Sequence, residues 1–281
     1  MFQFAMNRVE NLPEDRKIFS QDGRVFAAKM NTRMYDMVYF LGEYENYVTK
    51  VIGNVVKSED ICFDVGANFG WYTTFLSNLK NVLNKNVKEI HAFEPINYVF
   101  ANLRENIELA GSPENIYLNN FALTDEFSDT KIYISDKLGS GHSSLARDGS
   151  NKVTEKSIKT VPLDSYLSEN GIEKIDFIKI DIEGSELKFL KGGKKMFSQE
   201  IPPVIVMEMA LDTTRPFGYL PDDLLKFIKD QGEYEFYALD EVHSHLVKIQ
   251  NFQPDECGAN VLCMPKNADR KRLQGLKITG S

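Results

Sequence analysis

The chain has 281 residues, of which 42% are hydrophobic and 26% are charged, and its formal net charge is -8. This composition predicts a globular protein with one large core, and the negative charge disfavours a nucleic-acid partner because phosphate binding needs a positive field. No run approaches the ~20 apolar residues of a membrane span, and the N-terminus lacks the apolar core of a signal peptide. The three cysteines, Cys62, Cys257 and Cys263, cannot all pair, which favours the cytoplasm.

Short apolar runs alternate with helical patterns along the chain. Strands are predicted at residues 61–63, 90–93, 116–118, 177–180 and 204–207. One helix is predicted over residues 99–110, where apolar side chains recur every three or four positions, and another begins at Pro221 and ends at Gly232. This alternation predicts an α/β fold with a mostly parallel sheet and helices on both faces.

We expect three parts in the chain. Residues 1–57 form a helical and β extension that packs on the core, residues 58–265 form a Rossmann-like domain, and the polar residues 266–281 form a flexible tail. Within the domain, residues 131–163 break the alternation of strands and helices. Two short strand candidates there flank the glycine- and serine-rich residues 139–144, which indicate a mobile loop and hence a lid or substrate insertion.

A glycine turn follows the first strand of the domain. Asp64 ends the strand, and Gly66 and Gly70 precede a predicted helix, so that a cofactor can approach the backbone. Asn68 occupies the place of the second glycine in the dinucleotide pattern G-x-G-x-x-G. Asp64 would repel a pyrophosphate and suits the ammonium and sulfonium of S-adenosylmethionine. A turn that uses glycine only for chain passage is the alternative.

The next strands offer further cofactor contacts. Glu94 follows the second strand, where an acid can bind a ribose diol through two hydrogen bonds. Asn120 and Ala122 follow the third strand and could border an adenine. The full set of predicted cofactor-binding residues is Asp64, Gly66, Ala67, Asn68, Gly70, Glu94, Asn120, Ala122 and Asp181.

Five motifs follow one another along the chain. They are FDVGANFG at residues 63–70, AFEP at 92–95, REN at 104–106, VPLD at 161–164 and KIDIEG at 179–184. Together with GEYE at residues 42–45, they resemble the FkbM-type methyltransferases over about residues 42–209. The resemblance implies a seven-stranded class I methyltransferase fold, S-adenosylmethionine as methyl donor, and methylation of a hydroxyl on a sugar or natural product. It also implies cofactor roles for Asp64, Gly66, Asn68, Gly70 and Glu94.

Carboxylates at the strand ends are the candidate catalytic groups. Methyl transfer to oxygen requires an acceptor hydroxyl close to the methyl group, and a base often removes its proton. Asp181 and Glu183 follow the fourth main strand and Glu208 ends the fifth, at the sheet edge where ligands bind. Lys179 shares a strand face with Asp181, and we expect it to pair with an acid and keep it ionised. The alternative is that Asp181 and Glu183 only stabilise the start of the next helix.

Histidines and aromatic residues provide further candidates. His142 in the glycine- and serine-rich loop could act as the base or be an ordinary surface residue. Trp71 and the tyrosines and phenylalanine between residues 35 and 47 could stack on a sugar, although packing against the sheet is favoured.

Metal binding is not predicted. His243 and His245 lie two residues apart, but no ligand set recognised in the sequence completes a site with them, which favours a solvated face. Asp181, Glu183 and Glu208 could in principle hold a magnesium ion, as strand-end carboxylates do in some O-methyltransferases.

These patterns predict an S-adenosylmethionine-dependent O-methyltransferase acting on a small-molecule or glycan acceptor. The preferred acceptor is a hydroxyl of a sugar, glycan or glycosylated metabolite, and hydroxyls of lipids, polyketides or peptides are alternatives. A nicotinamide oxidoreductase is the nearest rival enzyme, weakened by the missing phosphate pattern. A catalytically inactive cofactor-binding scaffold is the rival without chemistry. The sequence gives no indication of oligomeric state.

Overall fold

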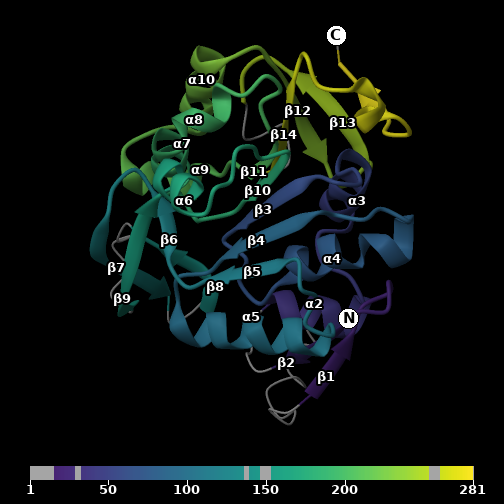
Figure 1. The fold of residues 1–281 in the computed structure, drawn as a ribbon, viewed down its shortest axis with the longest axis vertical. Coiled ribbons are helices and arrows are strands. Elements are labelled where there is room, and N and C mark those ends of the chain that lie inside the picture. The colour runs from purple at the N-terminus through teal and green to yellow at the C-terminus, as the bar shows by residue number, and fades with distance from the viewer. Residues whose placement is uncertain (1–15, 29–32, 136–138, 146–152, 253–259, 281) are drawn as a thin grey trace.

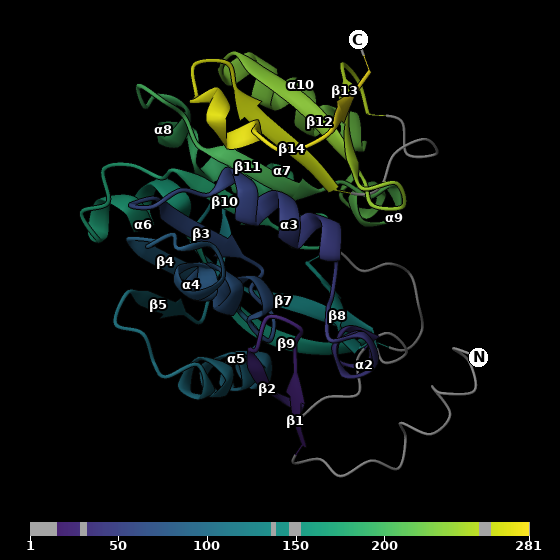
Figure 2. The same cartoon turned by 90° about the vertical axis from the view of Figure 1, so that its right-hand side faces the viewer.

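A computed structural model describes residues 16–28, 33–135, 139–145, 153–252 and 260–280. A nine-stranded sheet runs through these residues and carries helices on both faces (Figures 1 and 2). Its strand order is β15-β13-β12-β14-β11-β10-β3-β4-β5. The strands are β3 (Ile61–Val65), β4 (Glu89–Phe93), β5 (Ile116–Asn119), β10 (Phe177–Ile180), β11 (Val204–Glu208), β12 (Tyr234–Asp240), β13 (His245–Ile249), β14 (Asn260–Pro265) and β15 (Ile278–Thr279).

The sheet is mostly parallel. Strands β5, β4, β3, β10 and β11 run in one direction, and β14 is antiparallel to both of its neighbours, β11 and β12. The predicted α/β class is therefore confirmed. The predicted count of seven strands corresponds to β5 through β12 in the sheet order, and β13 and β15 extend the sheet beyond β12.

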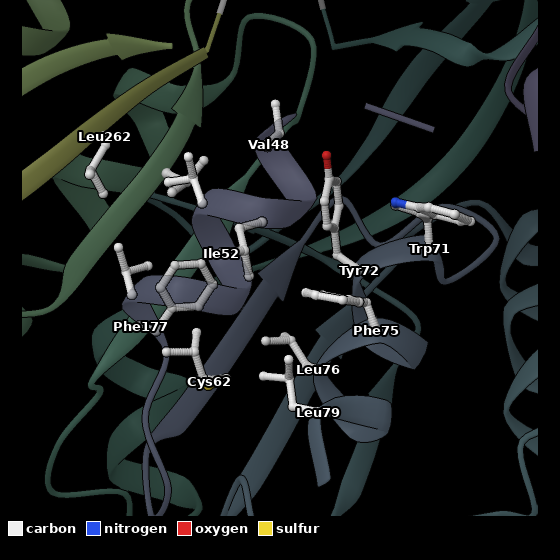
Figure 3. Close-up of a cluster of buried hydrophobic side chains, with 14 of the residues drawn as sticks. Val48, Ile52, Cys62, Trp71, Tyr72, Phe75, Leu76, Leu79, Phe177 and Leu262 are labelled. Carbon is white, nitrogen blue, oxygen red and sulfur yellow. The ribbon is translucent and has the colours of Figure 1, made fainter. Parts of the chain in front are cut away.

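Two apolar layers cover the sheet because side chains alternate along its buried strands. Phe177 of β10 packs with α3 and α4, whereas Ile178 and Ile180 pack with α6, α7 and α10. Figure 3 shows the first layer, in which Val48 and Ile52 of α3 lie close to side chains of the sheet and of α4. The α-helices are α2 (Arg33–Leu41), α3 (Asn46–Val55), α4 (Trp71–Leu83), α5 (Asn97–Leu109), α6 (Leu163–Glu169), α7 (Glu186–Gly192), α8 (Lys194–Phe197), α9 (Leu211–Thr214) and α10 (Pro221–Gln231). Among the residues that the structure describes, no helix combines the length and apolar character needed to cross a membrane.

A second sheet of four strands stands beside the first, in the order β6-β9-β7-β8. Its strands are β6 (Ala122–Thr124), β7 (Ser128–Ser135), β8 (Gly139–Ser144) and β9 (Val153–Pro162). The prediction of a loop at residues 139–144 is wrong, because these residues form β8 and pair with β7. A strand ladder uses backbone N–H and C=O groups, which glycine and serine supply as well as β-branched residues do.

The described residues of the N-terminal extension pack against the glycine turn. It contributes the hairpin of β1 (Arg16–Phe19) and β2 (Val25–Ala28). Arg24 donates hydrogen bonds to the carbonyl of Trp71 at 2.5 Å and to the hydroxyl of Thr74 at 2.9 Å. Asn106 accepts one from the backbone amide of Ala27 at 2.8 Å and donates one to the carbonyl of Phe69 at 2.7 Å. The asparagine of the REN motif thus joins the extension to the turn.

Residues 266–280, predicted to be a frayed tail, instead pack on the main sheet. They form the short helix η3 (Arg270–Leu273) and strand β15, which pairs with β13. Arg272 donates to both carboxylate oxygens of Asp60, at 2.6 and 2.9 Å, and the two side chains are only 12% and 6% exposed. The two partners stand 212 positions apart, so local sequence patterns could not reveal the contact.

We expect the substitution Arg272→Met to lower the free energy of unfolding by about 3 kcal/mol, because it leaves the buried Asp60 carboxylate without its partner. Urea denaturation followed by circular dichroism measures this change. The exposed Lys277→Met provides the control, with a change within about 0.5 kcal/mol. Equal midpoints for the two variants would show that the Arg272 contact does not stabilise the fold.

Candidate active site

A cavity of about 380 Å³ lies at the carboxyl ends of β3, β4, β10 and β11. This edge is where open α/β sheets bind their ligands. Met34, Tyr44 and Glu45 of the N-terminal segment line the cavity, and so do Ile132 and Ile158 of the second sheet. The N-terminal segment and the second sheet therefore supply walls of the same cavity.

The glycine turn forms the floor of the cavity. Asp64 is 1% exposed, accepts a hydrogen bond from the Thr73 hydroxyl at 2.5 Å, and lies beneath the lining residues rather than among them. Gly66 and Ala67 do line the cavity, and their backbone amides donate to the Phe93 carbonyl at 3.0 and 2.9 Å. The turn is thus fixed by bonds between strand ends, and burial raises the pKa of Asp64 to about 6.

The two glycines are needed for packing within the protein. Gly66 has φ +86°, and a Cβ on it would lie 1.9 Å from the backbone oxygen of Asp181. A Cβ on Gly70 would lie 2.6 Å from a methyl of Leu103 in α5, and Gly70 does not line the cavity. The expectation that glycine clears space for a cofactor therefore needs correction, because protein atoms occupy that space at both positions.

Glu94 and Asn68 present polar atoms to the cavity. The Glu94 carboxylate accepts backbone hydrogen bonds from Asn68 at 3.1 Å and Ile96 at 2.9 Å, and burial raises its pKa to about 7. The side-chain oxygen of Asn68 is buried without a hydrogen-bond partner. An unpartnered acceptor beside a carboxylate fits the hydroxyl and ammonium donors of S-adenosylmethionine, so the residues present suit the predicted cofactor.

Asn120 and Ala122 differ in their placement. Ala122 lines the cavity, whereas Asn120 lies outside it and donates to the backbone carbonyls of Glu94 and Pro95 at 2.9 and 3.2 Å. Asn120 therefore holds the segment that carries Glu94.

Three predicted carboxylates converge in one part of the cavity. Asp181, Glu183 and Glu208 line it, and one oxygen from each lies within 4.8 Å of the others, a spacing that could also hold a divalent cation. The Lys179 ammonium lies 3.7 Å from an Asp181 carboxylate oxygen and is 1% exposed. Lys179 thus lies within ion-pair distance of Asp181, as the predicted pairing with an acid requires.

Burial and neighbouring charges shift the pKa values of Lys179 and the carboxyl groups around it. Burial alone would lower the pKa of Lys179, but the carboxylates of Asp181, Glu45 and Glu208 raise it above its ordinary value. Burial and the charge of Asp181 raise the pKa of Glu183 to about 9. The charge of Asp181 and burial also raise the pKa of Glu208. Asp181 is thus the member of the trio that contacts the Lys179 ammonium.

Two further acids of the cavity, Glu45 and Glu241, were not predicted. Glu45 precedes α3 and accepts a hydrogen bond from the Tyr72 hydroxyl, and Glu241 follows β12. Burial raises the pKa of both carboxyls. The GEYE motif contained a signal for Glu45, whereas no local pattern marked Glu241.

The structure also bears on the alternative roles considered for Asp181, His142 and Trp71. Asp181 does not cap α7, because Ser185 is the N-cap residue and no side chain makes a cap hydrogen bond there. His142 belongs to β8, but its side chain falls outside the described residues. Trp71 stacks on Phe26 with ring centroids 5.6 Å apart, which agrees with packing rather than a free sugar platform.

Comparison with known proteins identifies the family. The model of the methyltransferase FkbM domain matches residues 64–234. The chain belongs to the FkbM methyltransferase family. This membership supports S-adenosylmethionine as the cofactor and does not favour a nicotinamide oxidoreductase or an inactive scaffold.

Two named methyltransferases match part of the chain. Hexuronic acid methyltransferase AglP of Haloferax volcanii is 25% identical over 169 residues, which are 59% of this chain and 64% of AglP. The 2-O-methyltransferase NoeI of Sinorhizobium fredii is 26% identical over 164 residues, which are 53% of this chain and 64% of NoeI. The chain thus spans less than two thirds of the length of these relatives. The crystal structure of methyltransferase FkbM from Methylobacillus flagellatus is similar over 83% of this chain and 48% of its own, with 18% identity and a TM-score of 0.46.

We expect Gly66→Ala to lower the free energy of unfolding by about 2 kcal/mol more than Gly111→Ala, and to weaken binding of S-adenosylhomocysteine. The added methyl would collide with the Asp181 backbone, whereas Gly111 has a similar φ of +90° and open space around it. Urea denaturation and titration calorimetry measure the two effects. Equal losses in both variants would mean that the contact between Gly66 and Asp181 is not limiting.

A pH dependence follows from Glu94. Its pKa of about 7 in the folded protein exceeds its ordinary value of 4.5, so its stabilising contribution is present below pH 4.5 and is lost as the pH rises through 7. Between pH 5 and pH 8, the unliganded wild type should lose about 2 kcal/mol more unfolding free energy than Glu94→Gln. Urea denaturation at the two pH values tests this, with the exposed Glu169→Gln as control. A Glu94→Gln variant with the full pH dependence of the wild type would contradict the assignment.

Proposed function

We propose that this chain is an S-adenosylmethionine-dependent O-methyltransferase whose acceptor is a hydroxyl of a sugar, glycan or glycosylated metabolite. The observation that carries the proposal is a group of half-buried carboxylates around the buried Lys179, in the same cavity as the glycine turn and Glu94. A turn that suits the donor and acids that suit the acceptor thus line one cavity at the ligand edge of the sheet.

The donor half of the cavity lies over the glycine turn. Glu94 would accept hydrogen bonds from the ribose hydroxyls, with Asn68 as a second polar contact and Ala122 as part of the apolar wall. Bound S-adenosylmethionine supplies an electrophilic methyl group on a positively charged sulfur. The surrounding carboxylates favour that charge and the approach of a polar acceptor.

The base is assigned to Asp181. Lys179 lies 3.7 Å from this carboxylate and orients it, and Asp181 would accept the proton of an acceptor hydroxyl there. Glu183 and Glu208, whose pKa values are raised, can donate or accept hydrogen bonds and orient neighbouring hydroxyls. Such an arrangement suits a substrate with several adjacent hydroxyl groups.

The choice of acceptor draws on charge and on the named relatives. AglP is named as a hexuronic acid methyltransferase and NoeI as a 2-O-methyltransferase, and both names agree with a carbohydrate acceptor. The formal charge of -8 and the acidic cavity oppose binding of a nucleic-acid backbone.

Cys62 and Cys263 are buried free thiols, which agrees with a reducing compartment such as the cytoplasm.

Calorimetric titration with S-adenosylhomocysteine and, separately, with NAD tests the enzyme class. We expect saturable binding of S-adenosylhomocysteine and none of NAD. Binding of NAD alone would replace the proposal by an oxidoreductase, and binding of neither ligand would remove the proposed cofactor site. Binding of S-adenosylhomocysteine without methyl transfer in the assay below would favour the inactive scaffold.

We expect Asp181→Asn to lower kcat for methyl transfer by about 10²- to 10⁴-fold, because the amide cannot accept the proton. The assay is transfer of a labelled methyl group from S-adenosylmethionine to oligosaccharides that contain hexuronic acid or neutral hexose. Glu183→Gln should reduce the rate less, and the exposed Asp212→Asn serves as the control with unchanged turnover. Retained turnover in both Asp181→Asn and Glu183→Gln would remove these carboxylates from the chemistry.

A further inference from the structure

The hairpin of β12 and β13 gathers three metal-ligating side chains outside the carboxylate group of the cavity. Asp240 ends β12, His245 begins β13, and these two residues are paired in the strand register. His243 lies in the turn between them. The sequence showed the two histidines, but the aspartate was not recognised as a third ligand because only the hairpin brings it opposite His245.

The spacing of the three side chains is that of a small cation site. One Asp240 carboxylate oxygen lies 2.9 Å from Nδ1 of His243 and 3.8 Å from Nδ1 of His245. The three ligand atoms all lie within 4.8 Å of one another. Metal–ligand bonds of about 2.0–2.2 Å in a tetrahedral site place ligand atoms roughly 3.3 Å apart, so small side-chain rotations suffice to enclose an ion.

A buried nitrogen without a partner is the second observation. Nδ1 of His245 is inaccessible to solvent and makes no hydrogen bond, although the His245 side chain as a whole is 15% exposed. A buried polar atom without a partner costs free energy that a ligand can recover. The other oxygen of Asp240 is already engaged, because it accepts the backbone amide of His243 at 2.9 Å. The remaining oxygen faces both imidazoles and is hydrogen-bonded to Nδ1 of His243 at 2.9 Å, a contact that a bound ion would replace.

We propose that Asp240, His243 and His245 bind a divalent transition-metal ion of the zinc class. Two imidazoles and one carboxylate are ligands that Zn²⁺, Ni²⁺ and Cu²⁺ accept, whereas Mg²⁺ and Ca²⁺ prefer oxygen alone. Three protein ligands leave a fourth position for water or another ligand. This site is separate from the carboxylates assigned to the acceptor, and the proposal holds whether or not the proposed methyl transfer does.

An ion bound at this hairpin would lie next to the active-site cavity. Glu241 follows Asp240 directly and lines the active-site cavity, so an ion bound at Asp240 would fix the rim from which Glu241 projects. Burial and, to a smaller extent, the charge of Asp240 raise the pKa of Tyr47 in α3, the helix that begins just after Glu45. The ion would thus hold together the hairpin that borders the cavity.

Titration of the full chain with Zn²⁺ after treatment with a chelator tests the proposal. We expect one ion per chain by calorimetry, and a Co²⁺ complex with the visible absorption of a histidine-ligated site. His243→Ala combined with His245→Ala should weaken Zn²⁺ binding by at least about 100-fold, because even groups around metal ligands are worth about 10- to 100-fold in affinity. Zn²⁺ should also raise the Tm of the wild type and leave that of the double variant unchanged.

Two control variants distinguish Zn²⁺ binding at this site from Zn²⁺ binding by side chains elsewhere in the chain. His142→Ala removes a histidine elsewhere in the sequence, and Asp181→Asn with Glu183→Gln removes carboxylates of the cavity, so both proteins should retain Zn²⁺ affinity. If the double histidine variant loses its native circular dichroism, the single variant at His243, whose side chain is 71% exposed, replaces it. Absence of Zn²⁺ binding by the wild type, or equal affinity in the histidine variant, would overturn the proposal. Loss of binding only in the cavity variant would also overturn it.

Discussion

A lysine ammonium buried in the middle of the sheet constrains the arrangement of this site. Lys179 is 1% exposed, and removing an ammonium from water costs several kcal/mol unless charges and hydrogen-bond acceptors surround it. Asp181 lies beside it, and the Asn260 side chain and the Ile180 carbonyl lie 3.3 and 3.4 Å away. Satisfying this one cation therefore brings the ends of neighbouring strands and the start of α3 to a single place.

The carboxylates gathered around that cation exceed what one lysine can neutralise. Glu45 and Glu208 both raise the pKa of Lys179, and their own carboxyls have raised pKa values. Gly66 lets β3 approach the backbone of Asp181, which brings this acid next to the glycine turn. One backbone contact thus fixes the distance between the glycine turn and Asp181.

Segments on either side of the domain complete the cavity that these contacts begin. The N-terminal extension is tied to the glycine turn through Arg24 and Asn106, and it delivers Glu45 to the site. The second sheet adds an apolar wall through Ile132 and Ile158. Segments outside the glycine turn and the strand-end acids therefore shape the walls of this cavity.

The sequence by itself determined the strand and helix pattern, the glycine turn, and the acids at the ends of β4, β10 and β11. These features are local, since buried strands show as apolar runs and the carboxyl ends of parallel strands share one edge. The tertiary structure alone decided the contact of Arg272 with Asp60, the roles of Glu45 and Glu241, the pairing of β8, and the meeting of Asp240 with His245. Each of these depends on strand pairing or packing between segments, and neither leaves a periodic signal in the residues that take part.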